Sequence, residues 1–308
     1  MTSSDRAEWL QWRSRGLGAS DIAGILGNSP WSSPYSVWCN KMGVTGDGGT
    51  STNAEAMRWG GLLEDAILDE TARRLDIVIA SRQERVEHAE WPIARATLDA
   101  RYYSEADPAD HGVIEVKTTS QPVWHEVPEY YEAQIQWQLA LTGEPRAWLP
   151  CLHMGRRLSL WQVEADPEIG AALLDIARDY WERFIATGIP PEIDGAPATS
   201  QAITARYTHE GAAIVDVTAL AIEVEALRAV RDELKVLTAN KDALENRLKD
   251  ALGDDGDTGA VEGQTAYTWK RSRDYPKLDA DLLREKYPRE AAECTSIVRG
   301  SRRFLLKG

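Results

Sequence analysis

The stretch Thr97–Thr118, TLDARYYSEADPADHGVIEVKT, constrains the fold of this chain most strongly. It predicts a strand that ends near Asp99, a hairpin loop, and a second strand over Gly112–Thr118, where β-forming residues predominate. Side chains alternate between the faces of a strand, so Glu115 and Lys117 point to the same side. If the two strands pair, Asp99 shares that side. Two carboxylates and an ammonium group then converge at one edge of a sheet.

Such a group suits a divalent metal ion. Mg²⁺ takes hard oxygen ligands, commonly one or two carboxylates together with waters and substrate phosphate. A neighbouring lysine can orient or deprotonate water, or offset charge on a phosphoryl oxygen. The same spacing is common in surface hairpins that carry a simple Glu/Lys pair. The residues alone therefore leave both interpretations open.

Length and composition indicate an intracellular globular protein. The 308 residues suffice for two domains, and 43% hydrophobic and 27% charged residues are typical of a soluble chain. No apolar run approaches the ~20 residues of a membrane span, and the start MTSSDRAEWLQWRSR lacks the apolar core of a signal peptide. Three scattered cysteines predict neither a disulfide framework nor a zinc site.

The net charge of −14 argues against a protein that coats DNA nonspecifically. It does not exclude a nuclease, because a nuclease needs carboxylates for its metal and can confine basic groups to a channel. Residues 269–308 hold 11 Lys and Arg against 6 Asp and Glu. This basic tail either contacts phosphate or is simply a solvated surface.

Three helices carry further candidate residues. Arg13 precedes GLGASDIAGILGNSPW, in which Ser20 is predicted to cap a short helix; a helix N-terminus beside arginines can hold a phosphate, or the serine only caps. Residues 55–75 form an amphipathic pattern, with Glu64 at the margin of the apolar stripe as either a partly buried carboxylate or a surface glutamate. Residues 129–143 predict a helix on which Gln134 shares a face with Gln138.

The second half of the chain differs in composition. Eleven of the 12 tryptophans precede residue 190, so we predict two domains, 1–195 and 196–308. The latter contains a long helix over residues 217–252, whose leucines at heptad spacing favour either a coiled coil or packing on its own chain. A small α/β tail follows, with strands predicted at 261–270 and 297–307 around a helix near 278–286.

Four motifs together resemble the YqaJ-like viral recombinase family, relatives of the λ-type exonuclease, from residue 9 to residue 190. They are Arg13 with GLGASDIAGILGNSPW and SPYSVW, Trp59-Gly60 followed by Glu64, Leu98-Asp99 with Glu115-Val116-Lys117, and Ala133-Gln134-Ile135-Gln136. Each motif is weak alone, but their order and spacing match the family. One position departs from it: the family often has Pro-Asp-Gly where this chain has Leu98-Asp99-Ala100.

The resemblance implies a restriction-endonuclease-like α/β core of the PD-(D/E)xK type, a mixed central sheet flanked by helices. It implies a Mg²⁺-dependent exonuclease that degrades linear double-stranded DNA from 5′ ends, in the cytoplasm of a bacterial host, and leaves 3′ tails for a single-strand annealing protein. Two metal ions are expected, with Mn²⁺ able to substitute, and the assembly expected is a ring-shaped trimer. The implied metal ligands are Glu64, Asp99, Glu115 and the Val116 carbonyl.

The remaining roles follow from the same motifs. Lys117 would activate or position the attacking water, helped by Gln134, and Arg13 and Ser20 would hold the terminal 5′-phosphate. Two alternatives stay open. One is a related nuclease of other polarity or an endonuclease; the versions with an iron–sulfur cluster on four cysteines do not fit three scattered ones. The other is a DNA-end-binding protein that kept the fold without cleavage.

Overall fold

The computed structural model describes residues 3–44, 54–207, 213–297 and 304–306. The chain divides into two compact units, Met1–His209 and Glu210–Gly308, which are described separately. The boundary predicted at 195/196 precedes this division. The reason is helix α7 (Pro197–Arg206), whose Thr199 hydroxyl bonds the buried Ser33 hydroxyl at 2.6 Å and so anchors the helix in the first unit.

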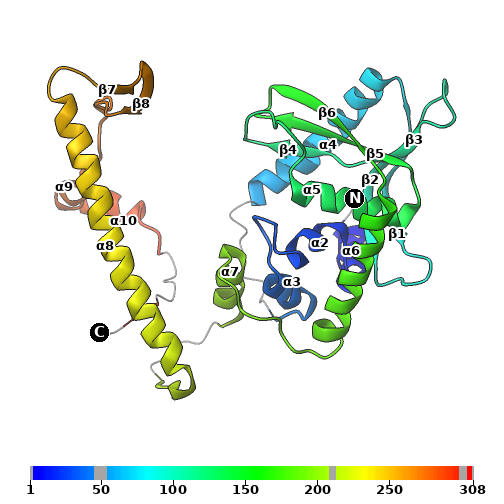
Figure 1. The fold of residues 1–308 in the computed structure, drawn as a ribbon, viewed down its shortest axis with the longest axis horizontal. Helices are drawn as coiled ribbons and strands as arrows, with labels where there is room; N and C mark the ends of the chain where they lie inside the picture. Colours follow the sequence, from blue (N-terminus) through cyan, green and yellow to red (C-terminus); the bar gives the residue numbers. More distant parts are fainter. Residues whose placement is uncertain (1–2, 45–53, 208–212, 298–303, 307–308) are drawn as a thin grey trace. The chain divides into compact units, whose positions relative to one another are not determined.

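Six strands form one mixed sheet in the described part of the first unit (Figure 1). They are β1 (Val78–Glu87), β2 (Arg95–Tyr103), β3 (His111–Ile114), β4 (Lys117–Thr119), β5 (Arg146–His153) and β6 (Arg157–Glu164). Strands β1, β2 and β3 pair antiparallel, β3 and β4 each run parallel to β5, and β6 pairs antiparallel with β5. Strands β3 and β4 follow β5 in one register, so they form a single path that is interrupted only at Glu115-Val116.

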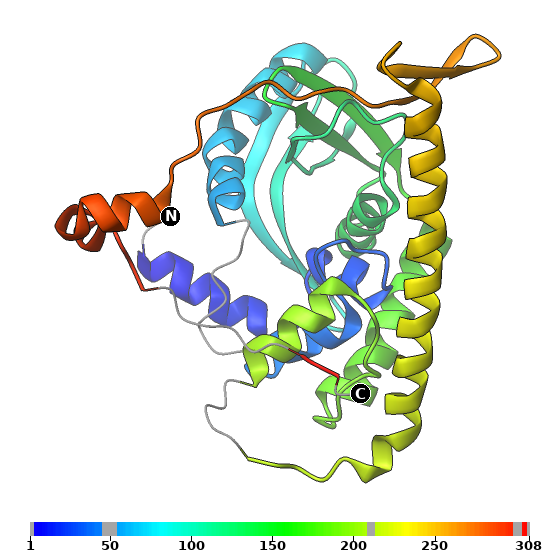
Figure 2. The same cartoon turned by 90° about the vertical axis from the view of Figure 1, so that its left-hand side faces the viewer.

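Helices cover both faces of this sheet. They are α1 (Ser3–Ser14), α2 (Ala19–Ile25), α3 (Pro34–Lys41), α4 (Ala54–Leu75), α5 (Glu129–Thr142) and α6 (Pro167–Tyr180), which continues as a π-helical turn over Trp181–Ile185. Neighbouring residues of β3 belong to different core clusters: Val113 packs with α2, α3, α5 and α6, and Ile114 packs with α4. Because neighbours on a strand face opposite ways, α4 and α5 lie on opposite sides (Figure 2). This confirms the predicted fold class of a mixed sheet flanked by helices.

Two local predictions were wrong. The first strand does not end near Asp99 but continues to Tyr103, because Ala100 and Tyr102 are buried against α4 and extend the pairing with β3. Ser20 does not cap its helix. Helix α2 begins at Ala19, and the Asp21 carboxylate accepts the Gly18 N–H at 2.8 Å, so an acidic side chain in the first turn stabilises that end instead.

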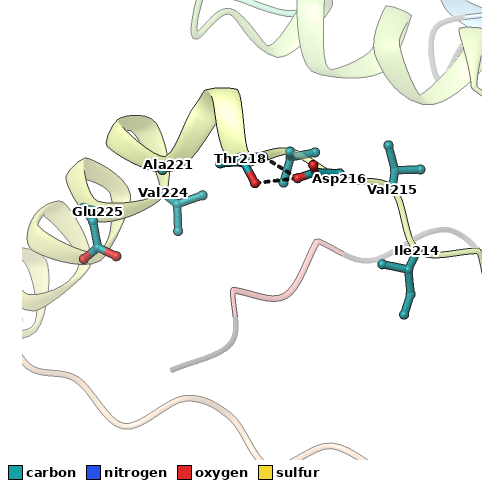
Figure 3. Close-up of a pocket in the computed structure, with 8 residues that line it drawn as sticks. Ile214, Val215, Asp216, Thr218, Ala221, Val224 and Glu225 are labelled. Atoms are coloured by element: carbon teal, nitrogen blue, oxygen red, sulfur yellow. Dashed lines mark hydrogen bonds between the residues drawn. The ribbon is translucent and has the colours of Figure 1, made fainter.

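The second unit is built around the long helix α8 (Ala221–Leu252), which confirms the long helix predicted from the heptads. A 3₁₀ turn, Thr218–Leu220, precedes it and is fixed by Asp216, which accepts the Thr218 N–H at 2.9 Å. Figure 3 shows this entry, where the apolar side chains of Ile214, Val215 and Val224 line an open pocket. Most of the seam leucines of α8, including Leu234 and Leu244, are exposed, whereas Leu227 is partly buried.

The end of the chain differs in part from its predicted layout. In place of one strand over 261–270, β7 (Thr258–Val261) and β8 (Gln264–Thr268) form a hairpin, because Glu262-Gly263 adopts the positive φ angles of a tight turn. Short helices α9 (Ala280–Lys286) and α10 (Pro288–Glu293) follow. The strand predicted at 297–307 lies largely outside the described residues. None of the helices in the described part of the chain has both the length and the apolarity to cross a bilayer.

The close approach of β3 to β5 yields a prediction on stability. A Cβ added at Gly112 would lie 2.1 Å from the Arg146 carbonyl oxygen, which belongs to the backbone of β5. We expect Gly112→Ala to lower the free energy of unfolding by about 1–3 kcal/mol, measured by denaturant titration. The control is Gly61→Ala in α4, where an added Cβ meets nothing within 4 Å and should be neutral or slightly stabilising. Equal stability of Gly112→Ala and Gly61→Ala would contradict the close approach of β3 to β5 at Gly112.

Candidate functional site

Two strands place the central carboxylates opposite each other. The pairing of β2 with β3 runs as far as Ala100 opposite Ile114. The next position in that register sets Asp99 opposite Glu115, where the two strands separate. There the Val116 N–H donates to Asp99 Oδ2 at 2.8 Å. A side chain thus replaces the strand-to-strand bond, and the Asp99 carboxylate lies at the interruption between β3 and β4.

Glu115 is held by three donors. It is only 4% exposed, and its Oε1 accepts hydrogen bonds from the Lys117 ammonium and from Gln134 Nε2, the latter at 2.5 Å. Its Oε2 accepts from Gln138 Nε2 at 2.6 Å. A buried carboxylate is costly unless it is hydrogen-bonded, and the two glutamines, one turn apart on α5, meet this need. They fix the position of Glu115.

Lys117 is charged in this environment. Burial alone would lower the pKa of Lys117, but the nearby Glu115 and Asp99 carboxylates outweigh that effect and raise it. Its Nζ also lies 5.0 Å from the centre of the Tyr131 ring, a cation–π distance. The ammonium group is therefore locked between the carboxylates and an aromatic ring, which suits a group that orients water or stabilises phosphoryl charge.

Glu64 joins this group from the other side of the sheet. It lies on α4 and accepts a hydrogen bond from Gln83 Nε2 at 2.5 Å. Burial raises the pKa of Glu64, and the charge of Glu115 raises it further. The pKa of Asp99 lies well above its ordinary value for the same reasons: burial first, then the charges of Glu115 and Glu64. Three carboxylates therefore repel one another in a partly desolvated site that has one lysine.

This imbalance of charge is the observation that tests for a metal. An excess of hard oxygen donors in a desolvated site matches the preferences of Mg²⁺ and Mn²⁺, so the residues present fit such an ion. Glu64, Asp99, Glu115 and the Val116 carbonyl are the groups that would hold it. Within the described residues, no three side chains of Asp, Glu, His or Cys converge on one point, because Glu115 points to its amide and ammonium donors and Glu64 to Gln83.

The two residues predicted to bind a terminal phosphate also lie together. The Arg13 guanidinium donates a hydrogen bond to Ser20 Oγ and stacks over Trp9, 5.2 Å from the ring centre. Because Asp21 satisfies the helix end, the exposed Ser20 hydroxyl is free to accept from Arg13. Helix α2, which carries Ser20, shares a hydrophobic core with α5. Every side chain predicted for the site thus lies in the first unit.

Two residues of the site were not among the predicted site residues. The face that Gln138 shares with Gln134 on α5 indicated either a polar contact at a site or a solvent-facing side chain, and the structure shows the polar contact. Gln83 had no signal in the sequence. It lies between Arg82 and Glu84, which pair with Ala100 and Leu98, and so sits opposite Asp99 with a positive φ of 52°. Left-handed backbone at a residue other than glycine is strained and is concentrated at functional sites.

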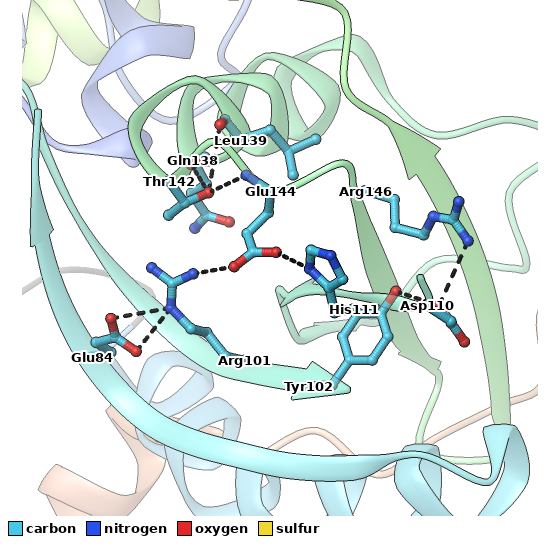
Figure 4. A network of polar contacts seen from close by, with 10 residues as sticks. All are labelled: Glu84, Arg101, Tyr102, Asp110, His111, Gln138, Leu139, Thr142, Glu144 and Arg146. Carbon is cyan, nitrogen blue, oxygen red and sulfur yellow. Dashed lines mark hydrogen bonds and ion pairs between the residues drawn. The ribbon is translucent and has the colours of Figure 1, made fainter. Parts of the chain in front are cut away.

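A second polar network braces the end of α5 (Figure 4). Arg101, two residues after Asp99, bonds Glu84 at 3.0 Å on β1 and also pairs with Glu144 in the turn after α5. Glu144 accepts in addition from His111 Nδ1 at 2.6 Å. Strands β1, β2 and β3 are thereby tied to the turn that ends α5. The network therefore helps to hold Gln138 over Glu115.

Comparison with known proteins matches these observations. Residues 8–145 match the family model of the YqaJ-like viral recombinase domain. The uncharacterized protein YqaJ of Bacillus subtilis (strain 168) is 26% identical over 292 residues, which cover 92% of this chain and 88% of that protein.

Solved structures of low sequence identity were also found. An alkaline exonuclease from Laribacter hongkongensis is 16% identical, with a TM-score of 0.47 over 59% of this chain and 93% of its own. A phage-related exonuclease from Haemophilus somnus is 13% identical, with a TM-score of 0.42 over 58% and 99%. The resemblance predicted from the motifs is confirmed by the family match, in which residues 8–145 match the model of the YqaJ-like viral recombinase domain.

Proposed function

We propose that this protein is a Mg²⁺-dependent exonuclease that degrades linear double-stranded DNA from 5′ ends and leaves 3′ single-stranded tails for phage-type recombination. One observation carries the proposal: Glu64, Asp99 and Glu115 share a partly desolvated site in which three carboxylates outnumber one lysine, and Glu115 fixes that lysine. The match to a viral recombinase domain over residues 8–145 supports it, because that domain contains all of these residues.

Each residue then has a physical role in phosphodiester hydrolysis. Glu64, Asp99, Glu115 and the Val116 carbonyl hold the metal. Bound Mg²⁺, or Mn²⁺ in its place, supplies Lewis acidity at a phosphoryl oxygen and lowers the pKa of water, and a second ion can stabilise the leaving oxygen.

The other groups act on the substrate and on water. Lys117 orients the attacking water and offsets charge on the phosphoryl group. Glu115, which is itself held by Gln134, fixes the position of Lys117. The guanidinium of Arg13 and the hydroxyl of Ser20 bind the terminal 5′-phosphate, since a charge-assisted bond from arginine suits phosphate geometry. A phosphate at this pair would select the strand end that is degraded.

The same resemblance supports the wider setting of this activity. We infer a ring-shaped trimer that encloses DNA, transfer of the 3′ tail to a single-strand annealing protein, and action in the cytoplasm of a bacterial host. A ring reconciles a net charge of −14 with a polyanionic substrate, because basic groups can face the channel while acidic groups face solvent. Light scattering on the purified full-length chain tests the trimer, and a monomeric mass with and without DNA would contradict it.

The function is tested by digestion of three DNAs in Mg²⁺: a linear duplex with 5′-phosphates, the same duplex with 5′-hydroxyls, and a closed circle. We expect loss of the 5′-phosphorylated strands, slower digestion of the 5′-hydroxyl duplex, an intact circle, and no reaction in EDTA. Arg13→Ala should remove the preference for 5′-phosphate. Arg15→Ala, a change of the same type at an exposed residue two positions on, should keep it.

Each other outcome identifies an alternative. Cutting of the circle would show an endonuclease, and digestion from 3′ ends would show the other polarity. Binding of ends without cleavage in Mg²⁺ or Mn²⁺ would show an end-binding protein.

A further inference from the structure

We propose that Trp31, Tyr130 and Tyr131 form an aromatic platform that holds the unpaired base of the 5′-terminal nucleotide beside Lys117. The proposal rests on the nuclease function proposed above and deepens it, because it assigns a binding site for a base as well as for phosphate. The ligand class is a nucleobase of any identity, removed from the stack at the end of a duplex.

The three rings are in mutual contact. The centre of the Trp31 ring lies 5.1 Å from that of Tyr130 in an edge-to-face arrangement and 6.0 Å from that of Tyr131. The two tyrosine rings lie 4.5 Å apart. Behind them, Trp124 packs on Tyr131 at 5.4 Å and on the buried His153 at 4.9 Å. The platform is thus the outer layer of an aromatic cluster rooted in the core of the first unit.

Trp31 is held in place, although much of its side chain faces solvent. It is 55% exposed, whereas both tyrosines are half-buried. The turn between α2 and α3 fixes its backbone, because Ser29 Oγ accepts the N–H groups of Trp31 and Ser32, each at 3.2 Å. An aromatic ring that is exposed and already ordered loses little conformational entropy when a ligand stacks on it.

The platform is continuous with the proposed catalytic groups. The same Tyr131 ring that contacts Trp31 carries the Lys117 ammonium 5.0 Å from its centre. Tyr130 and Tyr131 lie one turn before Gln134, which holds Glu115. Burial raises the pKa of Tyr131 to about 12, so its hydroxyl stays neutral beside a phosphate. A nucleotide whose phosphate reaches Lys117 therefore has its base within reach of these rings.

The chemistry of stacking fits an enzyme that must accept every sequence. Every base has a π face, so stacking on aromatic side chains is tolerant of sequence and contributes roughly 1–3 kcal/mol per base. A base that leaves its pair to bring its phosphate to the carboxylates loses stacking in the duplex, and the platform offsets that loss.

The test is a binding cycle that combines a change in the protein with a change in the DNA. Full-length wild type and Trp31→Ala are titrated in Mg²⁺ by fluorescence anisotropy against a 5′-phosphorylated duplex whose first linkages are hydrolysis-resistant phosphorothioates. The duplex carries either a base or an abasic residue at the 5′-terminal position. We expect Trp31→Ala to weaken binding about 10-fold when the base is present and less than about 2-fold when it is absent.

Matched controls isolate the ring. Trp31→Phe should retain most of the affinity, and Tyr103→Ala, which removes a 43% exposed aromatic side chain from the far end of β2, should have no effect on either DNA. An abasic residue on the complementary strand should leave the Trp31→Ala penalty intact. Melting temperatures of the variants confirm folding.

The outcomes separate the two proposals. An equal penalty on both DNAs, or no binding of DNA, overturns the platform. If the wild type digests DNA but the Trp31→Ala penalty does not depend on the 5′-terminal base, the nuclease function stands and the platform is refuted. If the penalty depends on that base but no DNA is digested, the platform stands and the nuclease function is refuted.

Discussion

Lys117→Ala is expected to slow DNA cleavage by about 10²–10⁴-fold while DNA binding stays measurable. The reason is geometric. The Lys117 ammonium is fixed by Glu115 and by the Tyr131 ring, so it enters the site in a defined position rather than as a mobile surface charge. Arg13 and Ser20 lie on other elements and are untouched by the change. Single-turnover digestion and anisotropy on the same preparation measure the two effects separately.

A second variant, Lys117→Gln, separates a loss of catalysis from a loss of folding. Alanine leaves Glu115 with an unpaired charge, and removing one partner of a buried pair is strongly destabilising. Lys117→Gln keeps a hydrogen-bond donor toward Glu115 without the ammonium charge, and it should be as inactive while more stable. Lys235→Ala, on the exposed surface of α8, is the matched control and should cleave at the wild-type rate. A folded Lys117 variant with near-normal cleavage would contradict the assigned site.

The central strands of this site could be predicted because the relevant rule is local. Alternation along VIEVKT places Glu115 and Lys117 on one side, and pairing of the strands adds Asp99. The length of β2 depends on burial, because the buried Ala100 and Tyr102 extend the strand past Asp99. The charged and turn-forming residues that follow Asp99 in the sequence did not indicate this extension. Propensity is weak compared with such tertiary packing.

Two of the donors around the carboxylates could not be predicted in the same way. Gln138 and Gln83 reach Glu115 and Glu64 across different elements, so their roles exist only once the helices are docked on the sheet. The pair predicted to bind phosphate, Arg13 and Ser20, shows a related limit. Serine is a common N-cap residue, but Gly18 is the N-cap here, its N–H donates to the Asp21 carboxylate, and the Ser20 hydroxyl accepts from Arg13. The capping rule therefore drew attention to Ser20 but predicted the wrong hydrogen bond for its hydroxyl.

Asp99→Asn should have opposite effects on stability and on function. The pKa of Asp99 is raised, first by burial and then by Glu115 and Glu64, so its ionised form destabilises the folded state. A raised folded-state pKa means that stability is fully present at low pH and is lost as pH rises through that pKa. Above it, the metal-free variant should therefore melt at a higher temperature than the metal-free wild type, and the difference should shrink as pH falls.

Mg²⁺ should reverse this order. An ion that binds only the folded state at 100 times its Kd adds about 2.7 kcal/mol, which corresponds to roughly 5–10 °C for a unit of this size. Wild type should show that shift and Asp99→Asn should not, because the variant lacks one charged ligand, and its cleavage should fall by at least about 100-fold. Differential scanning calorimetry with and without Mg²⁺ measures both effects.

Glu105→Gln removes an exposed carboxylate from the loop between β2 and β3 and serves as the control, with wild-type melting and a normal Mg²⁺ shift. Two results would contradict the assignment: a Mg²⁺ shift preserved in Asp99→Asn, or a metal-free variant that melts below the wild type at alkaline pH. Either would mean that the repulsion among Glu64, Asp99 and Glu115 is not what a bound cation relieves. If both expectations hold, the charge that destabilises the metal-free fold is the same charge that binds the metal for cleavage.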